Sequence, residues 1–314
     1  MTGVSGFIGS KLEEFLCRQF MVNGSSRKGR SAFSDKEYLK VDWSKPSLAI
    51  GSVFENVDAV IHCAGLAHET GYKSRYQDYF DANVTAAINV FVEAELSGVR
   101  KFIFLSSLSV FDTSGISVII DDKTEPCPIN DYGKTKYIAE QELIKLATKS
   151  DVELVIVRTP LVVGASAPGN LKSLLKLLNF PLPLPLVAKT RHRSFITIRS
   201  LAEYCGLILN QPHNPGVTEI NLANTPAIKL SELVEFIRRG LGIRNLNIYV
   251  PEKALFLVMY FLGRRLLFNK IYGGLFVVPS AKATEVGWEP AVDWKDELYE
   301  LGIESKNARK RELK

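Results

Sequence analysis

The chain opens on Gly3-Val4-Ser5-Gly6-Phe7-Ile8-Gly9, in which three glycines recur at intervals of three before an apolar helical pattern. The first glycine permits a tight turn, the second lets backbone N–H groups approach a pyrophosphate, and the third allows close packing of helix on strand. The helix that follows offers its partial positive charge to a phosphate. A glycine-rich turn is often only a turn, so the interpretation depends on what surrounds it. We predict a dinucleotide site that uses Gly3, Gly6, Phe7, Ile8 and Gly9.

A strand should precede this motif, yet only Met1 and Thr2 do. The central strand of such a sheet normally supplies about five or six residues. Either the natural chain begins upstream of Met1, or the first strand is absent. We favour the upstream start, because two unpaired strand edges at the centre of a sheet are costly.

Short apolar runs alternate with longer helical patterns through the first 160 residues. Such alternation predicts right-handed βαβ units around a parallel sheet, and continuous apolar strands are typical of a sheet covered on both faces. The predicted strands are 59–63, 102–105 and 154–157, and the predicted helices are 7–20, about 79–97, and 131–149.

The pattern changes after about Gly164. Pro181, Pro183 and Pro185 indicate a surface loop or an extended segment, and helical patterns return at 201–209, 231–241 and 253–262. We predict an α/β fold with a doubly wound parallel sheet of the Rossmann type and a smaller mixed α/β substrate domain. We expect the first domain to span 1–165 and the second to lie mainly within 166–303, from which some segments return to the first domain. Residues 304–314 form a basic tail.

Composition excludes several classes of protein. Of 314 residues, 46 % are apolar and 23 % charged, which excludes a disordered or collagen-like chain. The tail accounts for +3 of the net charge of +5, so the body is nearly neutral and a nucleic-acid binder is not expected. A frayed, solvated tail is the simplest interpretation, and contact with a membrane surface or polyanion is the alternative. Four scattered cysteines and the lack of a signal segment favour a cytoplasmic protein without a zinc site.

The longest apolar run, Ala254 to Leu262, is followed by Arg264 and Arg265. It is too short for a spanning helix, which needs about 18 residues. Two interpretations stay open: an interfacial helix lying on a membrane, or a core helix completed by basic residues. We favour the core helix.

Tyr132 and Lys136 lie four residues apart on a predicted helix and therefore share a face. Tyrosine is a poor acid–base near neutral pH, and a nearby ammonium favours the phenolate and lowers its pKa. The pair could thus transfer a proton. Tyr249 and Lys253 have the same spacing, but Pro251 stands between them, so we interpret that copy as structural.

Ser106 and Ser107 follow the strand predicted at 102–105. The carboxyl end of a parallel strand borders the binding crevice, where a hydroxyl can hydrogen-bond a substrate oxygen whose charge changes. Alone, the pair would only terminate a strand. Beside the tyrosine and lysine, it supplies a third catalytic candidate.

With these motifs the sequence resembles the extended short-chain dehydrogenase/reductase family, in its nucleotide-sugar branch of UDP-galactose 4-epimerase-like proteins. The resemblance implies Ser107, Tyr132 and Lys136 as the catalytic group, with Tyr132 as the acid–base and Ser107 also binding the substrate. It also implies that Tyr132 and Lys136 contact the cofactor, with Lys136 on the nicotinamide ribose. It also implies a homodimer formed through helices 79–97 and 131–149. The matching segments are 2–9, 58–65, 104–111, 132–140, 169–170, 193–196 and 287–290.

The resemblance also implies the binding residues. Asp42 would accept from the adenine amino group, while Asn170 and Arg193 would hold the diphosphate of the nucleotide sugar. The alternatives are a helix cap for Asn170 and a surface charge for Arg193. The cofactor wall would consist of Cys63, Ala64 and Gly65, with Asn83 close by.

Two departures narrow the chemistry. Members of the family that prefer NAD have an acidic residue after the second strand, whereas residues 23–28 contain Arg27 and no acidic residue. We therefore favour NADP(H) as the cofactor, with NAD(H) possible. The alternative interpretation of this segment is a basic surface loop.

Leu108 and Ser109 stand where dehydratases and decarboxylases carry carboxylates. That leaves C4 epimerisation or reduction of a 4-keto sugar. The resemblance favours C4 epimerisation of a UDP-linked hexose, and the stretch from Pro181 to Arg193 is similar to members of polysaccharide (O-antigen or capsule) pathways. The alternatives are an NADPH-dependent 4-keto-sugar reductase and a non-catalytic NADP-binding regulator.

Overall fold

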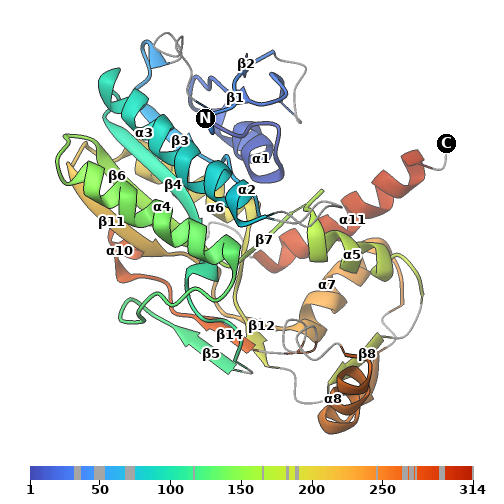
Figure 1. Ribbon diagram of the computed structural model, residues 1–314. Helices are drawn as coiled ribbons and strands as arrows, with labels where there is room; N and C mark the ends of the chain where they lie inside the picture. Colours follow the sequence, from blue (N-terminus) through green and yellow to red (C-terminus); the bar gives the residue numbers. More distant parts are fainter. Residues whose placement is uncertain are drawn as a thin grey trace.

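A computed structural model describes residues 1–31, 37–45, 54–67, 75–115, 117–164, 166–181, 184–187, 191–244, 247–263, 268, 272, 274–289 and 294–312. At its centre is a parallel sheet with the strand order β11-β6-β4-β3 (Figure 1). All three strands predicted in the first 160 residues are confirmed, and β11 joins them from later in the chain. The four strands are β3 (Ala59–His62), β4 (Lys101–Ser107), β6 (Glu153–Thr159) and β11 (Gly216–Asn221).

Thr2 occupies the place of the expected central strand. It forms single parallel bridges to Ser25 on one side and to His62 on the other. Ser25 belongs to β1 (Ser25–Ser26), and β1 in turn pairs in parallel with β2 (Leu39–Lys40), which extends the sheet on this side. The doubly wound order is therefore present, with the glycine turn following one bridged residue.

Helices cover both faces of this sheet (Figure 1). Alternate side chains of β4 enter two different buried clusters, with Ile103 and Leu105 in one and Phe102 and Phe104 in the other. The first cluster includes residues of α1 (Phe7–Leu16) and α6 (Ile198–Asn210), and the second includes residues of α3 (Ala86–Leu96) and α4 (Asp131–Ala147). A short helix α2 (Tyr76–Phe80) and a π-helical turn (Asp81–Thr85) lead into α3.

The remaining elements form smaller sheets and helices. β7 pairs with β10, β8 with β13, and β12, β9, β14 and β5 form a mixed sheet. The strands are β5 (Ser117–Ile120), β7 (Leu161–Val163), β8 (Leu184–Val187), β9 (His192–Arg193), β10 (Phe195–Thr197), β12 (Ile228–Lys229), β13 (Asn247–Val250) and β14 (Gly274–Val277). The helices are the 3₁₀ turn Leu108–Val110, α5 (Gly169–Leu178), α7 (Leu230–Leu241), α8 (Glu252–Phe261), α10 (Ala281–Glu285) and α11 (Trp294–Glu312).

Two expectations are wrong. The helix predicted at 253–262 forms as α8, but none of its residues is buried, so it is not a core helix. An apolar face does not by itself ensure that another element covers it. Residues 304–312 do not fray but continue α11 as a helix. Arg264 and Arg265 lie outside the described residues. Within the described ranges, no helix combines the length and apolarity needed to cross a membrane.

Candidate active site

A cavity of about 150 Å³ lies beside the first glycine turn. Its walls bring together segments that are far apart in the sequence: the turn after Thr2, the loop after β1, the residues after β2 and those after β3. The predicted cofactor residues that line it are Gly3, Gly6, Arg27, Asp42, Cys63, Ala64 and Gly65. Phe7, Ile8 and Gly9 do not line it and instead begin α1 directly after Gly6.

The glycines stand where side chains have no room. Gly3 has a left-handed φ of +72°, and a Cβ there would lie 2.8 Å from the amide nitrogen of Ala64. A Cβ on Gly9 would clash with the carbonyl oxygen of Gly3. This close backbone cradle at a helix N-terminus fits the pyrophosphate of a dinucleotide.

Thr2 and His62 support the wall of the cavity, a role that sequence reasoning missed. The Thr2 hydroxyl accepts a hydrogen bond from the Ala64 amide at 3.2 Å and lies 3.1 Å from Nδ1 of His62. Burial, reinforced by the charge of Lys136, lowers the pKa of His62 to about 3. The imidazole is therefore neutral and serves as a rigid part of the wall.

Asn83 lies in the π-helical turn and ties the cavity wall to α4. Its Oδ1 accepts from the Leu66 amide at 2.8 Å, and its Nδ2 donates to the Leu66 carbonyl at 3.1 Å and to Oγ1 of Thr135 at 3.0 Å. A Cβ on Gly65 would lie 2.8 Å from this Oδ1. These contacts make Asn83 a positioning residue of the wall, and it does not line the cavity.

The N-terminus of α4 approaches the segment that follows β4. The Asn130 side chain caps the helix by accepting from the Gly133 amide at 2.9 Å. A Cβ on Gly133 would clash with the backbone carbonyl of Ser109, so the approach depends on glycine at this position. The close contact places Tyr132 and Lys136, on the first turns of α4, beside the end of β4.

Ser107 and Tyr132 lie near each other at this junction, since the Ser107 hydroxyl acts to lower the pKa of Tyr132. The Ser107 hydroxyl also accepts from the Ser109 amide at 3.1 Å and donates to its hydroxyl at 3.2 Å. Ser106, on the opposite face of the strand, donates to Glu140 instead. The geometry therefore favours Ser107 over Ser106 as the serine that accompanies Tyr132.

Lys136 is held on the end of β4, where its ammonium donates to the Leu105 carbonyl at 2.8 Å. Burial lowers the pKa of Lys136 to about 8, and the Glu140 carboxylate opposes this shift. Burial raises the pKa of Tyr132, while the nearby Ser107 hydroxyl opposes the rise. The expected lowering of the Tyr132 pKa by Lys136 is not seen, because burial is the largest effect and the charge of Lys136 does not contribute to the shift.

Glu140 anchors α4 to the sheet, and its role was also missed. It is fully buried and accepts from Arg158 of β6 through Nε at 3.1 Å and Nη2 at 2.8 Å, and from the Ser106 hydroxyl. Arg158 also bonds Glu219 of β11 at 2.8 Å. The sequence contains a signal for this role, because Glu140 follows Lys136 by four residues and so lies one turn further along the same helix face.

The predicted diphosphate residues lie away from this cavity. Asn170 is in the first turn of α5, whose N-cap is Pro168, so Asn170 is not the cap. Arg193 lies on β9 opposite Ile228 of β12 and is partly buried, and burial lowers the pKa of its guanidinium. Arg193 does not line the 150 Å³ cavity.

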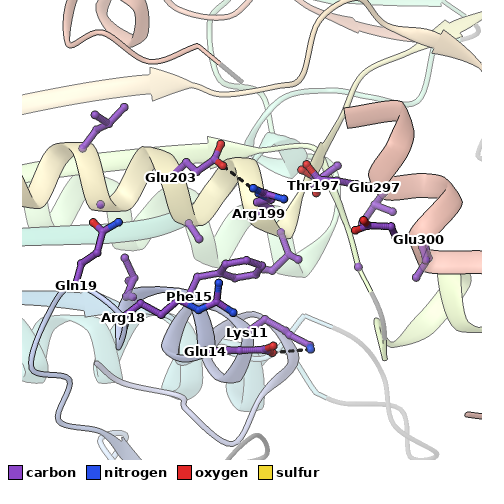
Figure 2. Close-up of a pocket in the computed structure, with 18 of the residues that line it drawn as sticks. Lys11, Glu14, Phe15, Arg18, Gln19, Thr197, Arg199, Glu203, Glu297 and Glu300 are labelled. Atoms are coloured by element: carbon purple, nitrogen blue, oxygen red, sulfur yellow. Dashed lines mark hydrogen bonds and ion pairs between the residues drawn. The ribbon is translucent and has the colours of Figure 1, made fainter. Parts of the chain in front are cut away.

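A larger cavity of about 690 Å³ lies between α1, α6 and α11, and none of the predicted site residues lines it. Figure 2 shows its charged walls, where Lys11 pairs with Glu14 at 2.7 Å and Arg199 with Glu203 at 3.2 Å. Glu297 of α11 also faces it. Burial raises the pKa of Glu297 to about 7. A hydrogen bond with Thr197 and the charge of Arg199 oppose this rise, while the negative charges of neighbouring glutamates add to it.

The raised pKa predicts a pH-dependent stability effect. The folded state binds the Glu297 proton more tightly than the unfolded state, so ionisation destabilises the fold as pH rises from about 4.5 to 7. Glu297→Gln should raise the unfolding free energy at pH 8 by about 1 kcal/mol, after allowing for solvent screening of a partly exposed group. At pH 5 most of this gain should vanish. Urea denaturation at both pH values measures this gain in unfolding free energy, and Asp296→Asn, at an exposed neighbour, is the control. Equal gains for Glu297→Gln at pH 5 and pH 8 would contradict the prediction.

Comparison with known proteins agrees with this architecture. The family model for the NAD dependent epimerase/dehydratase family matches residues 1–223. The UDP-glucose 4-epimerase of Vibrio cholerae is 28% identical over 92% of this chain and 90% of its own. The N-acetyl-alpha-D-glucosaminyl-diphospho-ditrans,octacis-undecaprenol 4-epimerase of Escherichia coli O157:H7 is 25% identical over 90% of this chain and 83% of its own.

The same fold occurs in solved structures. The UDP-glucuronic acid 4-epimerase from Bacillus cereus, in complex with UDP-glucuronic acid and NAD, superposes with a TM-score of 0.76 at 18% identity over 98% of both chains. The family match covers the glycine cradle, the end of β4 and the first turns of α4, where the candidate site lies. This chain therefore belongs to the NAD dependent epimerase/dehydratase family of enzymes.

Proposed function

We propose that this enzyme epimerises C4 of a nucleotide-linked hexose. The observation that carries the proposal is that Ser107 and Tyr132 come together at the end of β4, where α4 approaches the strand. Lys136 connects this pair to the dinucleotide cavity, because a Cβ on Gly65 of the cavity wall would lie 3.5 Å from its Nζ. The names of the relatives support a nucleotide-sugar substrate.

The roles follow from where each group lies. The glycine turn and the wall at Cys63–Gly65 would hold the nicotinamide cofactor, which when bound supplies hydride transfer at C4. In its ionised form, Tyr132 accepts the O4 proton on its phenolate oxygen and later returns it, and Ser107 positions the substrate oxygen. Lys136 keeps a positive charge between the end of β4 and the cavity wall at Gly65. Leu108 and Ser109 offer no carboxylate for dehydration or decarboxylation.

Proton NMR tests the reaction directly. The purified chain is incubated with UDP-glucose and, separately, with UDP-N-acetylglucosamine in the presence of NAD⁺ or NADP⁺. We expect the C4 epimer of at least one sugar to form without net consumption of cofactor. Cofactor binding, shown by a thermal shift, without conversion of either sugar would contradict this substrate class.

Reduction of a 4-keto sugar is the second candidate reaction, and Arg27 favours it because this exposed cation lines the cofactor cavity. No acidic residue stands in 23–28 to bind a ribose 2′-hydroxyl. An arginine there suits the 2′-phosphate of NADPH. Stoichiometric NADPH oxidation with a UDP-4-keto-6-deoxyhexose would identify a reductase.

Arg27→Ala tests the cofactor preference. We expect the Kd of NADPH to rise about tenfold, because a charge-assisted bond to the 2′-phosphate is lost, and the Kd of NAD⁺ to change less than about twofold. Isothermal titration calorimetry measures both values. Lys28→Ala is the control, since Lys28 is exposed but does not line the cavity. Equal losses for the two cofactors would contradict an NADP(H) preference.

We further propose that the chain acts in the cytoplasm, supplies sugars for polysaccharide assembly and forms a homodimer through α3 and α4.

A lipid-diphosphate-linked sugar, of the kind named for the Escherichia coli relative, is an additional substrate class that we propose. The exposed apolar face of α8 favours it, because such a sugar is presented at a membrane.

A further inference from the structure

Arg27 lies in the connection from β1 to β2, on a tight turn at residues 26–29. The Gly29 amide closes this turn by donating to the Ser26 carbonyl at 3.1 Å, and Gly29 has a left-handed φ of +67°. The Tyr38 amide, just before β2, donates to the Gly29 carbonyl at 2.8 Å. Arg27 is the second residue of the turn, and both Ser26 and Arg27 line the cofactor cavity.

Glu13 of α1 holds both ends of this connection. Its carboxylate accepts from the Ser31 hydroxyl, two residues after the turn, and from the Tyr38 hydroxyl at 2.6 Å. Glu13 is only 2% exposed, so water has little access to these bonds. Figure 1 shows α1, β1 and β2 at the same end of the molecule. One buried carboxylate thus joins the helix that follows the glycine turn to the segments on either side of Arg27.

The Tyr38 ring is fixed by packing as well as by its hydroxyl. A Cβ on Gly24 would lie 2.9 Å from Cγ of Tyr38 and 2.9 Å from Cγ1 of Val4 in the glycine turn. The ring therefore lies directly against the backbone at Gly24, with no space for a side chain between them. Tyr38 transmits the position of Glu13 to the Gly29 end of the turn, because its own amide bonds the Gly29 carbonyl.

Glu13 itself does not line the cofactor cavity. It can therefore act on a bound cofactor only through the residues that it holds. Arg27, in contrast, is exposed on the cavity wall. An arginine meets a phosphate best through two parallel N–H bonds, so its direction of approach matters as well as its charge. A turn that is already fixed loses less conformational entropy when a ligand binds.

We propose that Glu13 is a positioning residue for the cofactor, which fixes the turn at residues 26–29 so that the Arg27 guanidinium meets the 2′-phosphate of NADP(H). The inference rests on the proposed use of NADP(H) and deepens it. Glu13 adds to the affinity for NADP(H) without touching the ligand, and it contributes little to the affinity for NAD(H), which lacks the 2′-phosphate.

Isothermal titration calorimetry of the full chain with NADPH and NAD⁺ tests the proposal. We expect Glu13→Ala to raise the Kd of NADPH about fivefold and that of NAD⁺ less than about twofold. Tyr38→Phe keeps the ring and removes one hydroxyl, so the Kd of NADPH should rise about threefold. Glu13→Gln can still accept from Tyr38 and can donate to Ser31, so its Kd should stay within about twofold of wild type.

Glu14→Ala is the matched control on the same helix. Glu14 faces the larger cavity and pairs with Lys11 at 2.7 Å, so the Kd of NADPH should stay within about twofold of wild type. Thermal denaturation of each variant reports whether it is folded. If Glu13→Ala does not fold, Tyr38→Phe takes its place in the measurements.

A double-mutant cycle separates positioning from a merely structural role. In the Arg27→Ala background, Glu13→Ala should change the Kd of NADPH less than about twofold, because the group that Glu13 positions is already gone. Equal losses for NADPH and NAD⁺, or effects of Glu13 and Arg27 that multiply independently, would overturn the proposal. Unchanged NADPH affinity in both Glu13→Ala and Tyr38→Phe would overturn it too. If Arg27→Ala itself leaves NADPH affinity unchanged, the proposed cofactor preference fails, and this inference fails with it.

Discussion

Tyr132→Phe is expected to lower turnover about a thousandfold while leaving the fold and the cofactor affinity unchanged. Phenylalanine keeps the ring but loses the oxygen that lies near Ser107 and carries the proton in the proposed reaction. Acid–base groups of this kind typically contribute factors of about 10² to 10⁴. Tyr132 does not line the cofactor cavity, so binding there should be spared.

Two measurements on the same preparation make this prediction specific. Initial rates give the loss of turnover, and thermal shifts give cofactor binding, with about 2.7 kcal/mol of stabilisation expected at a hundred times the Kd. Tyr137→Phe, five residues further along α4, is the matched control and should keep wild-type activity. Full activity of Tyr132→Phe would refute the assigned acid–base role.

Glu140→Ala is expected to lower the unfolding free energy by about 3 kcal/mol. The substitution leaves the nearly buried Arg158 with one carboxylate partner, Glu219, instead of two. It also removes the acceptor of the Ser106 hydroxyl. Removing a buried partner costs far more than losing a surface pair, because water cannot replace the buried carboxylate and the remaining partner, Glu219, is partly exposed.

Urea denaturation measures this loss, and α4 offers a matched control. Glu142 pairs with Lys145 at 2.7 Å on the exposed side of the same helix. Glu142→Ala should cost less than about 0.5 kcal/mol, since water screens exposed pairs. Similar losses for the two variants would show that the buried pair does not anchor α4 to the sheet.

Local patterns were sufficient for much of the fold. Apolar patterns predicted the three central strands β3, β4 and β6 and several of the helices, because side chains alternate in a strand and recur every three to four residues in a helix. They did not predict β11, α5 or α11. Spacing also brought Tyr132 and Lys136 to one helix face, and the glycine turn marked the cavity. Such features depend on residues close together in the chain, so the sequence alone determines them.

Features that depend on distant segments were decided by tertiary structure. The bridges of Thr2 to Ser25 and His62, and the pairing of Glu140 with Arg158, join residues whose distance in the chain carries no periodic signal. Burial set the direction of the Tyr132 pKa, against the expectation from its neighbour Lys136. The sequence shows that α8 has an apolar face, but whether such a face is buried depends on which other element reaches it, and that is determined only when the whole chain packs.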